Sequence, residues 1–414
     1  MSWSDGAAEP AGRWRQLTIL SVGILLAEAP WFTSGAVAPS LRAEWGADGV
    51  ELGLLVVAVQ LGFAAGAIGL AIVGAPDVIR GRWLFTAGAL VAAGANLAFA
   101  LWATDVWQAL PFRALTGAGV AACYPVAMNM AAGWFRGQRG LAIGILIGAL
   151  TAGVALPYLL QAMGLSAGLA WRPVVALASG AALAGAAIVA AGARSGPFEV
   201  QAPRFSPVVA AAAFRVAGVR LANLGYLGHM WELFGMWTWV PGFLVAALAV
   251  GGMTDPTAAS LAAFVVVGSG ALGCVAAGAL ADRLGRTTVT IGAMAASGTA
   301  AVAAGLLFGA PAGVVLAVVI IWGVTVVADS GQFSAAVSEL SPPGTSGSAL
   351  SVQTATGFVL TSVTIIAIGA LDPSGVDGWR IGFGLLALGP LVGIVAMWRL
   401  RRRPEAILMA GGRR

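Results

Sequence analysis

The chain has 414 residues, of which 59% are hydrophobic and only 9% are charged, and its net charge is +5. A soluble domain of this length would need roughly a quarter of its residues charged. The composition therefore excludes a soluble domain. All basic residues are arginine, and most lie between long apolar segments. That placement argues against binding to nucleic acid and for a membrane protein.

Apolar segments follow one another along the chain, each close to the ~20 residues that a helix needs to cross a bilayer. They are too long and unbroken for barrel strands. The sequence therefore predicts an all-α polytopic membrane protein of twelve transmembrane helices, the first of which contains Glu28 and Pro30 and is no cleavable signal peptide. We expect the helices near residues 17–38, 50–73, 83–103, 107–131, 141–163, 171–192, 221–249, 260–281, 288–308, 312–335, 347–370 and 380–399.

The arginines indicate the orientation of these helices. All but four of the 22 basic residues fall at the chain ends or in loops on one side of the predicted membrane. By the positive-inside rule that side is cytoplasmic, which puts both termini and the proline-containing stretch 193–218 in the cytoplasm of a protein in the inner membrane. We expect 193–218 to be a linker between an N-terminal six-helix bundle, 1–192, and a C-terminal six-helix bundle with a short basic tail, 219–414.

The two halves of the sequence share features at an offset near 205 residues. The loop 278–287, Gly-Ala-Leu-Ala-Asp-Arg-Leu-Gly-Arg-Thr, matches the loop 74–82 in character and position. Trp171-Arg172 opens one helix, and Trp379-Arg380 opens its counterpart. Glu28 and Glu232 lie 204 positions apart. These features predict an internal structural repeat.

The stretch 278–287 resembles the cytoplasmic loop signature of the major facilitator superfamily, and 74–82 resembles it with one extra residue before its glycine. Residues 113–119 are similar to that family's helix-4 motif. The resemblance implies two pseudo-symmetric six-helix bundles that rock around a central solute site. Residues 134–144 also resemble the helix-5 entry of nitrate/nitrite, cyanate and oxalate/formate-type carriers, but helix 2 offers only Gln60 where nitrate-type carriers have an arginine.

Ionisable residues inside membrane helices are costly and usually face a cavity or a partner. His229 and Glu232 are three residues apart on one helix face, where they could form a proton relay or a structural polar contact. Glu28, beside Pro30, is expected to face Glu232 across the central cavity, with one of the two acids protonated near neutral pH. The alternative is that Glu28 bonds the local backbone at the kink. Asp329 is a fourth candidate for proton coupling, or for substrate binding.

Arg113 is the only arginine expected within the bundle, so it is either an anion contact or part of a salt bridge between helices 1 and 4. The family resemblance implies that this arginine tunes proton coupling. Further substrate-binding candidates are polar or aromatic side chains within the spans: Trp31, Gln60, Tyr124, Asn129, Tyr226, Trp237 and Gln332. Other tryptophans, at positions 102, 107, 171 and 379, are expected to anchor the outer membrane boundary.

The charged residues of the two repeated loops are expected to form a cytoplasmic gate. They are Asp77, Arg80 and Arg82 in the first loop, Arg139 at the start of helix 5, and Asp282, Arg283 and Arg286 in the second loop. An aspartate at such a helix end can accept hydrogen bonds from the N-terminal amides of a helix in the other half. We also expect Asp282 to reach Arg139.

No phosphate-binding loop or Cys/His metal cluster is present in the sequence, and Cys123 and Cys274 lie far apart in apolar stretches. The prediction is therefore a proton-coupled secondary transporter without cofactor or metal, not an enzyme, acting as a monomer on a small molecule. An acid-rich cavity favours export of a neutral or cationic solute, whereas the carrier-like features favour a small anion held by Arg113. The alternatives are a transport-fold receptor, for which the longest loop is short, and an intramembrane enzyme, for which His229 has no nucleophile in its own helix.

Overall fold

The computed structural model describes residues 10–135, 138–199, 206–373 and 375–413, and the described residues form helices without any β-strand. Ten helical segments are long and apolar enough to cross a membrane. Two further crossings are made by helices that are broken in the middle, which gives the twelve that the sequence predicts. The helices are α1 (Arg13–Ala27), α2 (Thr33–Ala36), α3 (Ala38–Trp45), α4 (Gly49–Ile72), α5 (Ala75–Val78), α6 (Gly81–Trp102), α7 (Val106–Val120), α8 (Tyr124–Ala132), α9 (Arg139–Ser166), α10 (Trp171–Gly192), α11 (Pro207–Ala213), α12 (Ala217–Val250), α13 (Pro256–Leu284), α14 (Arg286–Leu306), α15 (Ala312–Val326), α16 (Ser330–Leu340), α17 (Ser346–Leu371), α18 (Val376–Arg401) and the 3₁₀ helix η1 (Pro404–Gly412).

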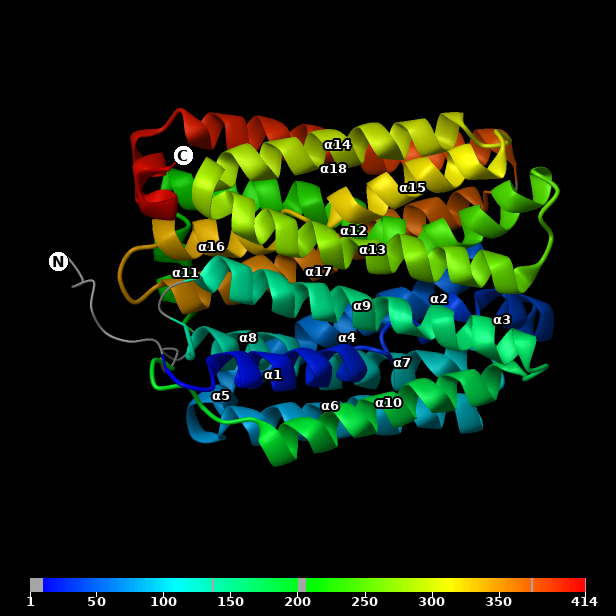
Figure 1. Cartoon of the computed structure of the whole chain (residues 1–414), viewed down its shortest axis with the longest axis horizontal. Helices are drawn as coiled ribbons and strands as arrows, with labels where there is room; N and C mark the ends of the chain where they lie inside the picture. The colour runs from blue at the N-terminus through cyan, green and yellow to red at the C-terminus, as the bar shows by residue number, and fades with distance from the viewer. Residues whose placement is uncertain (1–9, 136–137, 200–205, 374, 414) are drawn as a thin grey trace.

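The helices of the first half of the chain lie together, as do those of the second half (Figure 1). In the first half α6 packs on α7 and α10, and α1 packs on α10. In the second half α18 packs on α12 and α14. The halves meet where α9 packs along α13 and α4 packs along α17.

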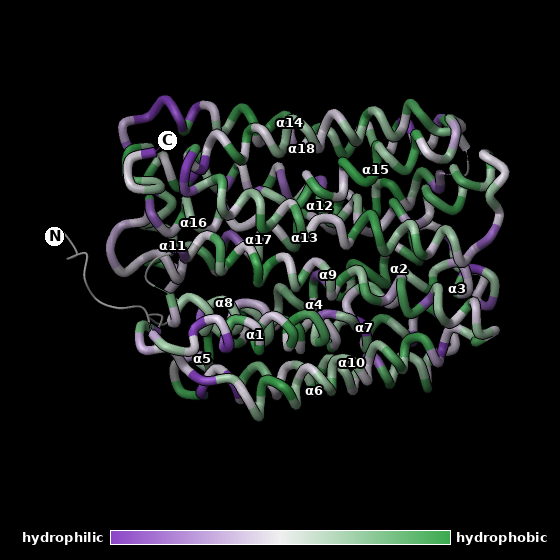
Figure 2. Tube along the Cα trace, viewed as in Figure 1, coloured by the Kyte–Doolittle hydropathy of each residue, from purple (hydrophilic) through white to green (hydrophobic). Residues whose placement is uncertain are grey.

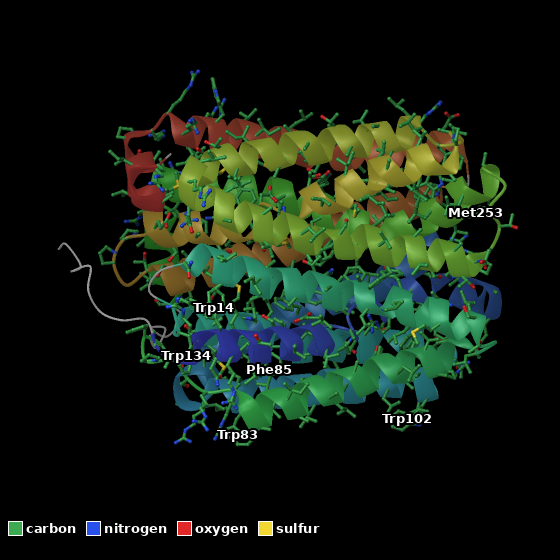
Figure 3. The ribbon with its side chains drawn as sticks, viewed as in Figure 1. Trp14, Trp83, Phe85, Trp102, Trp134 and Met253 are labelled. Carbon is green, nitrogen blue, oxygen red and sulfur yellow. The ribbon has the colours of Figure 1, made fainter. Side chains whose placement is uncertain are left out.

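Helix α1 begins, and α18 ends, at the same end of the molecule, which we call the basic end (Figure 1). Hydrophilic residues gather at the basic end and at the opposite, far end, with apolar helices between them (Figure 2). Trp14, Trp83 and Trp134 lie near the basic end and Trp102 near the far end (Figure 3). Tryptophan favours the two membrane–water interfaces, so these ends mark the membrane boundaries.

Two of the four predicted outer anchors are exposed at the far end: Trp102 by 66% and Trp107 by 64%. The prediction is wrong for Trp171 and Trp379, which are only 4% and 3% exposed. Both open a helix, but their rings turn inward. The Trp171 ring packs against Trp45, with centroids 5.5 Å apart, and the Trp379 ring packs against Phe243 at the same distance.

Matching helix breaks reveal the internal repeat. α7 ends at Val120 and α8 resumes at Tyr124, while α15 ends at Val326 and α16 resumes at Ser330. The glycines beside these breaks are also equivalent. A Cβ on Gly117 would lie 2.0 Å from the Val59 carbonyl oxygen, and one on Gly323 would lie 2.0 Å from that of Val266. The two halves therefore cross their helices in the same way.

Candidate solute and proton site

A cavity of about 60 Å³ lies between the halves, and residues at three helix breaks, Trp31, Tyr124 and Ser330, contribute to its lining. Aromatic side chains make up much of its wall: Trp31, Tyr124, Tyr226, Phe234, Trp237 and Phe358. Hydroxyl groups of Ser330, Ser334 and Thr354 complete the polar part of the lining. This volume has room for only a few water molecules, so the halves must separate before a solute can enter.

The wall of the cavity is built from rings that touch across the two halves. The Trp31 ring, from the break between α1 and α2, stacks on Phe234 of α12 at 5.8 Å and on Phe358 of α17 at 5.7 Å between centroids. Offset-stacked rings at such separations attract each other beyond simple burial. The same rings make this part of the cavity wall apolar.

A second cleft, of about 280 Å³, is lined by residues of both halves toward the far end. Tyr158 of α9 lines this cleft and donates a hydrogen bond of 3.3 Å to the carbonyl of Trp237, which lines the central cavity. Tyr158 and Trp237 thus separate the cleft from the cavity. Arg42 of α3 also lines the cleft and forms an ion pair of 3.1 Å with Asp372, at the end of α17. Arg42 and Asp372 were not predicted as site residues, although each is a charge at a helix end on the side poor in arginine.

The basic end is closed by the packing of α9 on α13. A Cβ on Gly278 would lie 2.7 Å from the Gly140 carbonyl oxygen, and one on Gly144 would lie 2.8 Å from that of Cys274. The Asp282 carboxylate covers the first turn of α9, because a Cβ on Gly140 would lie 2.6 Å from Asp282 Oδ2. Asp282 thus lies at the start of a helix of the other half, while the hydrogen bonds expected from the amides of that helix stay a prediction.

The side chains of Asp77 and Arg139 lie outside the described residues, so their roles in the gate, and the Asp282–Arg139 contact, stay predictions. Of the other predicted gate residues, Arg80 and Arg283 are exposed, and the Arg82 guanidinium lies 4.8 Å from the centroid of the Trp83 ring.

Arg286 and Gln332, predicted for the gate and for the solute site, bind each other. Arg286 donates two hydrogen bonds, of 2.7 and 2.6 Å, to Glu339 of α16 and a third, of 2.8 Å, to Gln332 Oε1. These contacts join α14 to α16 within the second half. Gln332 is therefore part of an ionic cluster and does not line the cavity, and Arg286 does not cross to the first half. Glu339 was missed, although it is an acid near the end of an otherwise uncharged α16.

His229 and Asp329 form a buried pair that the sequence analysis did not foresee. His229 Nδ1 of α12 lies 2.8 Å from Asp329 Oδ1, and both side chains are only 1% exposed. Asp329 lies at the break between α15 and α16, and the next residue, Ser330, lines the cavity. The Tyr226 ring, which also lines the cavity, has its centroid 6.3 Å from that of His229. A titratable pair thus lies directly behind the cavity wall.

Glu232 points into the second half of the molecule. Its carboxylate accepts hydrogen bonds from Ser297 of α14, at 2.7 Å, and from the Trp322 indole of α15, at 2.8 Å. Glu232 therefore faces α14 and α15 and not Glu28, contrary to the prediction. Residues three apart on a helix share a face only broadly, and here His229 and Glu232 reach different helices.

Glu28 is fully buried at the end of α1, where the helix stops before Pro30. Its backbone N–H donates to the Ile24 carbonyl, and its own carbonyl accepts from Trp31. Neither carboxyl oxygen has a hydrogen-bond partner among the described residues. The side chain does not bond the local backbone, so the structural alternative considered for this residue is not observed.

Arg113 of α7 is fully buried and holds the break between α1 and α2. Its Nη1 donates to the Pro30 carbonyl at 3.0 Å and to Asn96 of α6 at 2.9 Å, and its Nη2 donates to the Trp31 carbonyl. A carboxylate is not among these partners, so the expected salt bridge is replaced by hydrogen bonds. Arg113 does not line the cavity, and a contact with an anionic solute stays a prediction.

Two further candidates lie away from the cavity. Gln60 is fully buried on α4, with neither side-chain polar atom hydrogen-bonded among the described residues, and Asn129 is exposed on α8. Phe234 and Phe358 do line the cavity and were missed. Phe234 could have been found from the sequence, because it lies one helical turn from Met230 on the face of α12 that lines the cavity. The contribution of Phe358 depends on the rotation of α17 about its axis, which the sequence does not show.

Comparisons with known proteins agree with this architecture. The model of the Major Facilitator Superfamily matches residues 20–365. In fold, the chain is similar to the xylose transporter XylE from E. coli, with 16% identity, a TM-score of 0.73, and coverage of 94% of this chain and 98% of that one. It is also similar to a bacterial homologue of the human lysosomal transporter Spinster, with 15% identity, a TM-score of 0.70, and coverage of 95% and 98%. A segment of 118 residues is 32% identical to the 4-hydroxybenzoate transporter PcaK of Pseudomonas putida, which is 28% of this chain and 26% of that protein. The chain thus matches only about a quarter of the length of this curated relative.

Proposed function

Because the chain belongs to the Major Facilitator Superfamily, we propose that it is a proton-coupled secondary transporter that moves a small aromatic solute by alternating access. The observation that carries this proposal is the aromatic cavity between the halves, with a buried His–Asp pair directly behind its wall. The family is one of transporters, so the alternatives of a receptor and of an intramembrane enzyme are set aside.

The lining of the cavity favours an aromatic solute. Flat rings on both halves can stack on the faces of an aromatic ring, while Tyr and Ser hydroxyl groups can bind its polar substituents. The cavity lining includes no basic side chain, so a carboxylate solute would be bound through its ring and through the Tyr and Ser hydroxyl groups, and a small inorganic anion, which has no ring, is disfavoured. The limited similarity to a 4-hydroxybenzoate transporter supports the same class of solute.

Alternating access would use the two contacts between the halves in turn. At the basic end, glycine-mediated packing of α9 on α13 closes the path. At the far end, Arg42–Asp372 and Tyr158–Trp237 are the polar contacts between halves that border the cleft. We propose that the described state is occluded and that breaking these two contacts opens it outward. The bundles 1–192 and 219–414 would be the rocking units of a monomer in the inner membrane, with both termini cytoplasmic.

Proton coupling would use the pair at the break of α15 and α16. Protonation of Asp329 removes the charge that attracts His229, which weakens the link between α12 and α16. Since Ser330 and Tyr226 connect this pair to the cavity wall, occupancy of the cavity and protonation of the pair would influence each other. Glu232, held by two donors, would orient α12, and Glu28 would be a second buried acid on the opposite side.

A transport assay in proteoliposomes tests the proposal. With a proton gradient imposed, we expect uptake or extrusion of 4-hydroxybenzoate or a related benzoate or phenol, competition by other aromatic compounds, and no competition by xylose or choline. Trp31→Ala should weaken the apparent affinity about tenfold or more, since it removes a stacking face. The matched control Trp102→Ala, at an exposed position of the far end, should leave the affinity unchanged. Transport of xylose or choline without any aromatic solute would overturn the proposed substrate class.

A further inference from the structure

We propose that the groove between α12 and α18 at the basic end binds one anionic phospholipid. The groove has a volume of about 820 Å³ and is lined by Arg220 of α12 and by Arg399, Arg402 and Arg403 at the end of α18. The proposal rests on the polarity of the groove, which changes from basic to apolar along its length, and is independent of the transported solute.

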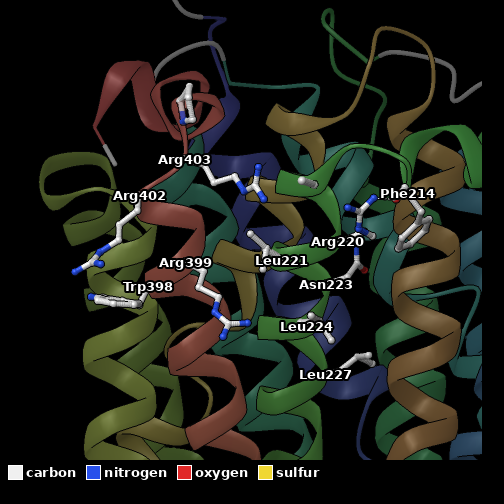
Figure 4. A pocket seen from close by; sticks show the side chains of 12 residues that line it. Phe214, Arg220, Leu221, Asn223, Leu224, Leu227, Trp398, Arg399, Arg402 and Arg403 are labelled. Carbon is white, nitrogen blue, oxygen red and sulfur yellow. Dashed lines mark hydrogen bonds between the residues drawn. The ribbon is translucent and has the colours of Figure 1, made fainter.

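The arginines surround the upper part of the groove without an acidic partner in the lining. Arg399 and Arg403 point from α18 into the gap, and Arg220 of α12 lies beside Phe214 (Figure 4). Arg220 is oriented by the hydrogen bonds that it donates to the carbonyls of Phe214, at 3.0 Å, and Arg215, at 2.8 Å. Within the described part of the chain, no hydrogen bond or ion pair is made by the side chain of Arg399 or of Arg403. A phosphate group in the gap would supply the missing negative charge.

The lower part of the groove is apolar and faces lipid. Leu221, Leu224 and Leu227 of α12 continue the wall below Arg220. A second hollow of about 340 Å³ shares Leu221, Leu224 and Arg399 with the first and continues along Leu391, Val392 and Val395 of α18. Both helices span the membrane, so at this depth an acyl chain is the natural occupant.

Trp398 places the groove at the level of the headgroups. Its ring is 45% exposed, and the Arg402 guanidinium lies over it, with Cζ 3.5 Å from the ring centroid. Tryptophan favours the membrane interface, and arginine near the interface is attracted to anionic lipids. A soluble anion would use the arginines alone, whereas a phospholipid would use both parts of the groove. Because the basic and apolar parts are continuous, the groove fits a phospholipid better than a soluble anion.

Lipid titration of the purified, full-length transporter in detergent tests this site. We expect phosphatidylglycerol to raise the melting temperature well above the effect of phosphatidylcholine, because binding to the folded state stabilises it. Arg399→Gln with Arg403→Gln should lower the affinity for phosphatidylglycerol about five-fold per arginine, or roughly twenty-five-fold for both. The control Arg15→Gln with Arg194→Gln removes the same charge from exposed residues of the first half and should keep the wild-type affinity.

A second pair of measurements separates the lipid from a free anion. Val392→Trp fills the apolar hollow but keeps every arginine, so it should weaken phosphatidylglycerol binding, while glycerol phosphate at millimolar concentration should not stabilise the wild-type protein. An unchanged phosphatidylglycerol shift in the double arginine variant would overturn the proposal. Equal shifts with phosphatidylglycerol and phosphatidylcholine, or a full shift with glycerol phosphate, would also overturn it. The melting temperature of each variant without lipid reports whether it folds.

Discussion

Asp329 occupies in the second half the position that Cys123 occupies in the first, since each is the last residue before the helix resumes, at α16 and α8 respectively. The repeat supplies the same backbone break twice, but only one break carries a titratable acid beside a histidine. The two halves therefore share a geometry and differ in charge. This asymmetry makes the second half the natural place for proton coupling.

Asp329→Asn keeps the size of the side chain and removes its charge. We expect this variant to exchange labelled solute across liposomes at a rate near wild type, but to lose gradient-driven accumulation by at least about tenfold, because no proton can be released from residue 329. Exchange and accumulation are measured in the same vesicles. The control Asp377→Asn, at an exposed position near the start of α18, should accumulate solute normally. Normal accumulation by Asp329→Asn would place the proton elsewhere.

Glu232→Gln is expected to fold and to retain accumulation. The amide oxygen can accept from the Trp322 indole, and the amide N–H₂ can donate to the Ser297 hydroxyl, which can reverse its role. The loss in stability should be about 0.5–1.5 kcal/mol. Glu232→Leu, which leaves the indole N–H unpaired, should cost more. Thermal unfolding measures the loss of stability in both variants, and uphill transport measures accumulation by Glu232→Gln. Loss of accumulation in a folded Glu232→Gln protein would return the coupling role to Glu232.

Breaking the Arg42–Asp372 pair should open the far end. Both side chains are about half exposed, at 48% and 55%, so the pair contributes at most about 1 kcal/mol. In a protein without native cysteines, Arg42→Ala should increase labelling of a cysteine at Ser260, in the cleft lining, up to about five-fold. The reversed pair, Arg42→Asp with Asp372→Arg, should restore slow labelling. Arg380→Ala, which breaks an exposed pair within α18, is the control, and an equal increase there would show that the effect is not specific to the cleft.

The ionisation of Glu44 makes the stability of the folded protein depend on pH at the far end. Hydrogen bonds from the Trp171 indole, at 2.6 Å, and from Arg172, at 2.7 Å, lower the pKa of Glu44 from its usual value of 4.5. Because the pKa is lower in the folded protein, the stabilisation is present above pH ~4.5 and disappears as the pH falls through the folded-state pKa. Glu44→Gln should therefore lower the melting temperature at pH 7, by the equivalent of about 1 kcal/mol or less, and the difference from wild type should shrink toward pH 3. A difference that is constant with pH would contradict this assignment.

Gly323 should not tolerate a side chain. A Cβ there would lie 2.0 Å from the Val266 carbonyl oxygen, a backbone atom that can move only if α13 and α15 separate. Gly323→Ala is expected to lower the thermal stability by several kcal/mol or to prevent folding. Gly292→Ala, in α14 with no atom within 4 Å of the new Cβ, should be neutral or slightly stabilising. Fluorescence-detected size-exclusion chromatography after heating compares the two variants.

The sequence predicted the membrane crossings well, because their signal is local. A run of about 20 apolar residues bounded by charges is visible without knowledge of the partner helices, and the predicted limits of α4, α6 and α10 differ from the observed ones by at most two residues. The repeat was also visible, since its charged loops recur at one offset. The contribution of Trp31, Tyr124, Tyr226 and Trp237 to the cavity followed from their position in the central helices.

The pairing of polar residues was not predictable in the same way. Periodicity shows which residues share a helix face, but not how the helix is rotated against its neighbours. Thus Glu232 was assigned to the cavity and instead binds Trp322, while Asp329, on another helix, is the partner of His229. Arg113 was expected to find a charged partner and instead binds main-chain carbonyls, which no side-chain pattern reveals.

The bonds from Arg113 to the carbonyls of Pro30 and Trp31 have a consequence for how this transporter can change. Every amino acid at position 31 carries the same carbonyl group, so the anchoring of the cavity wall does not depend on which side chain projects from it. Substitutions at position 31 can reshape the solute-facing surface while the bent backbone beneath it stays in place. If the proposed function holds, the architecture separates the residue that contacts a solute from the residue that maintains the scaffold, and new specificities would arise through single exchanges without refolding of the bundle.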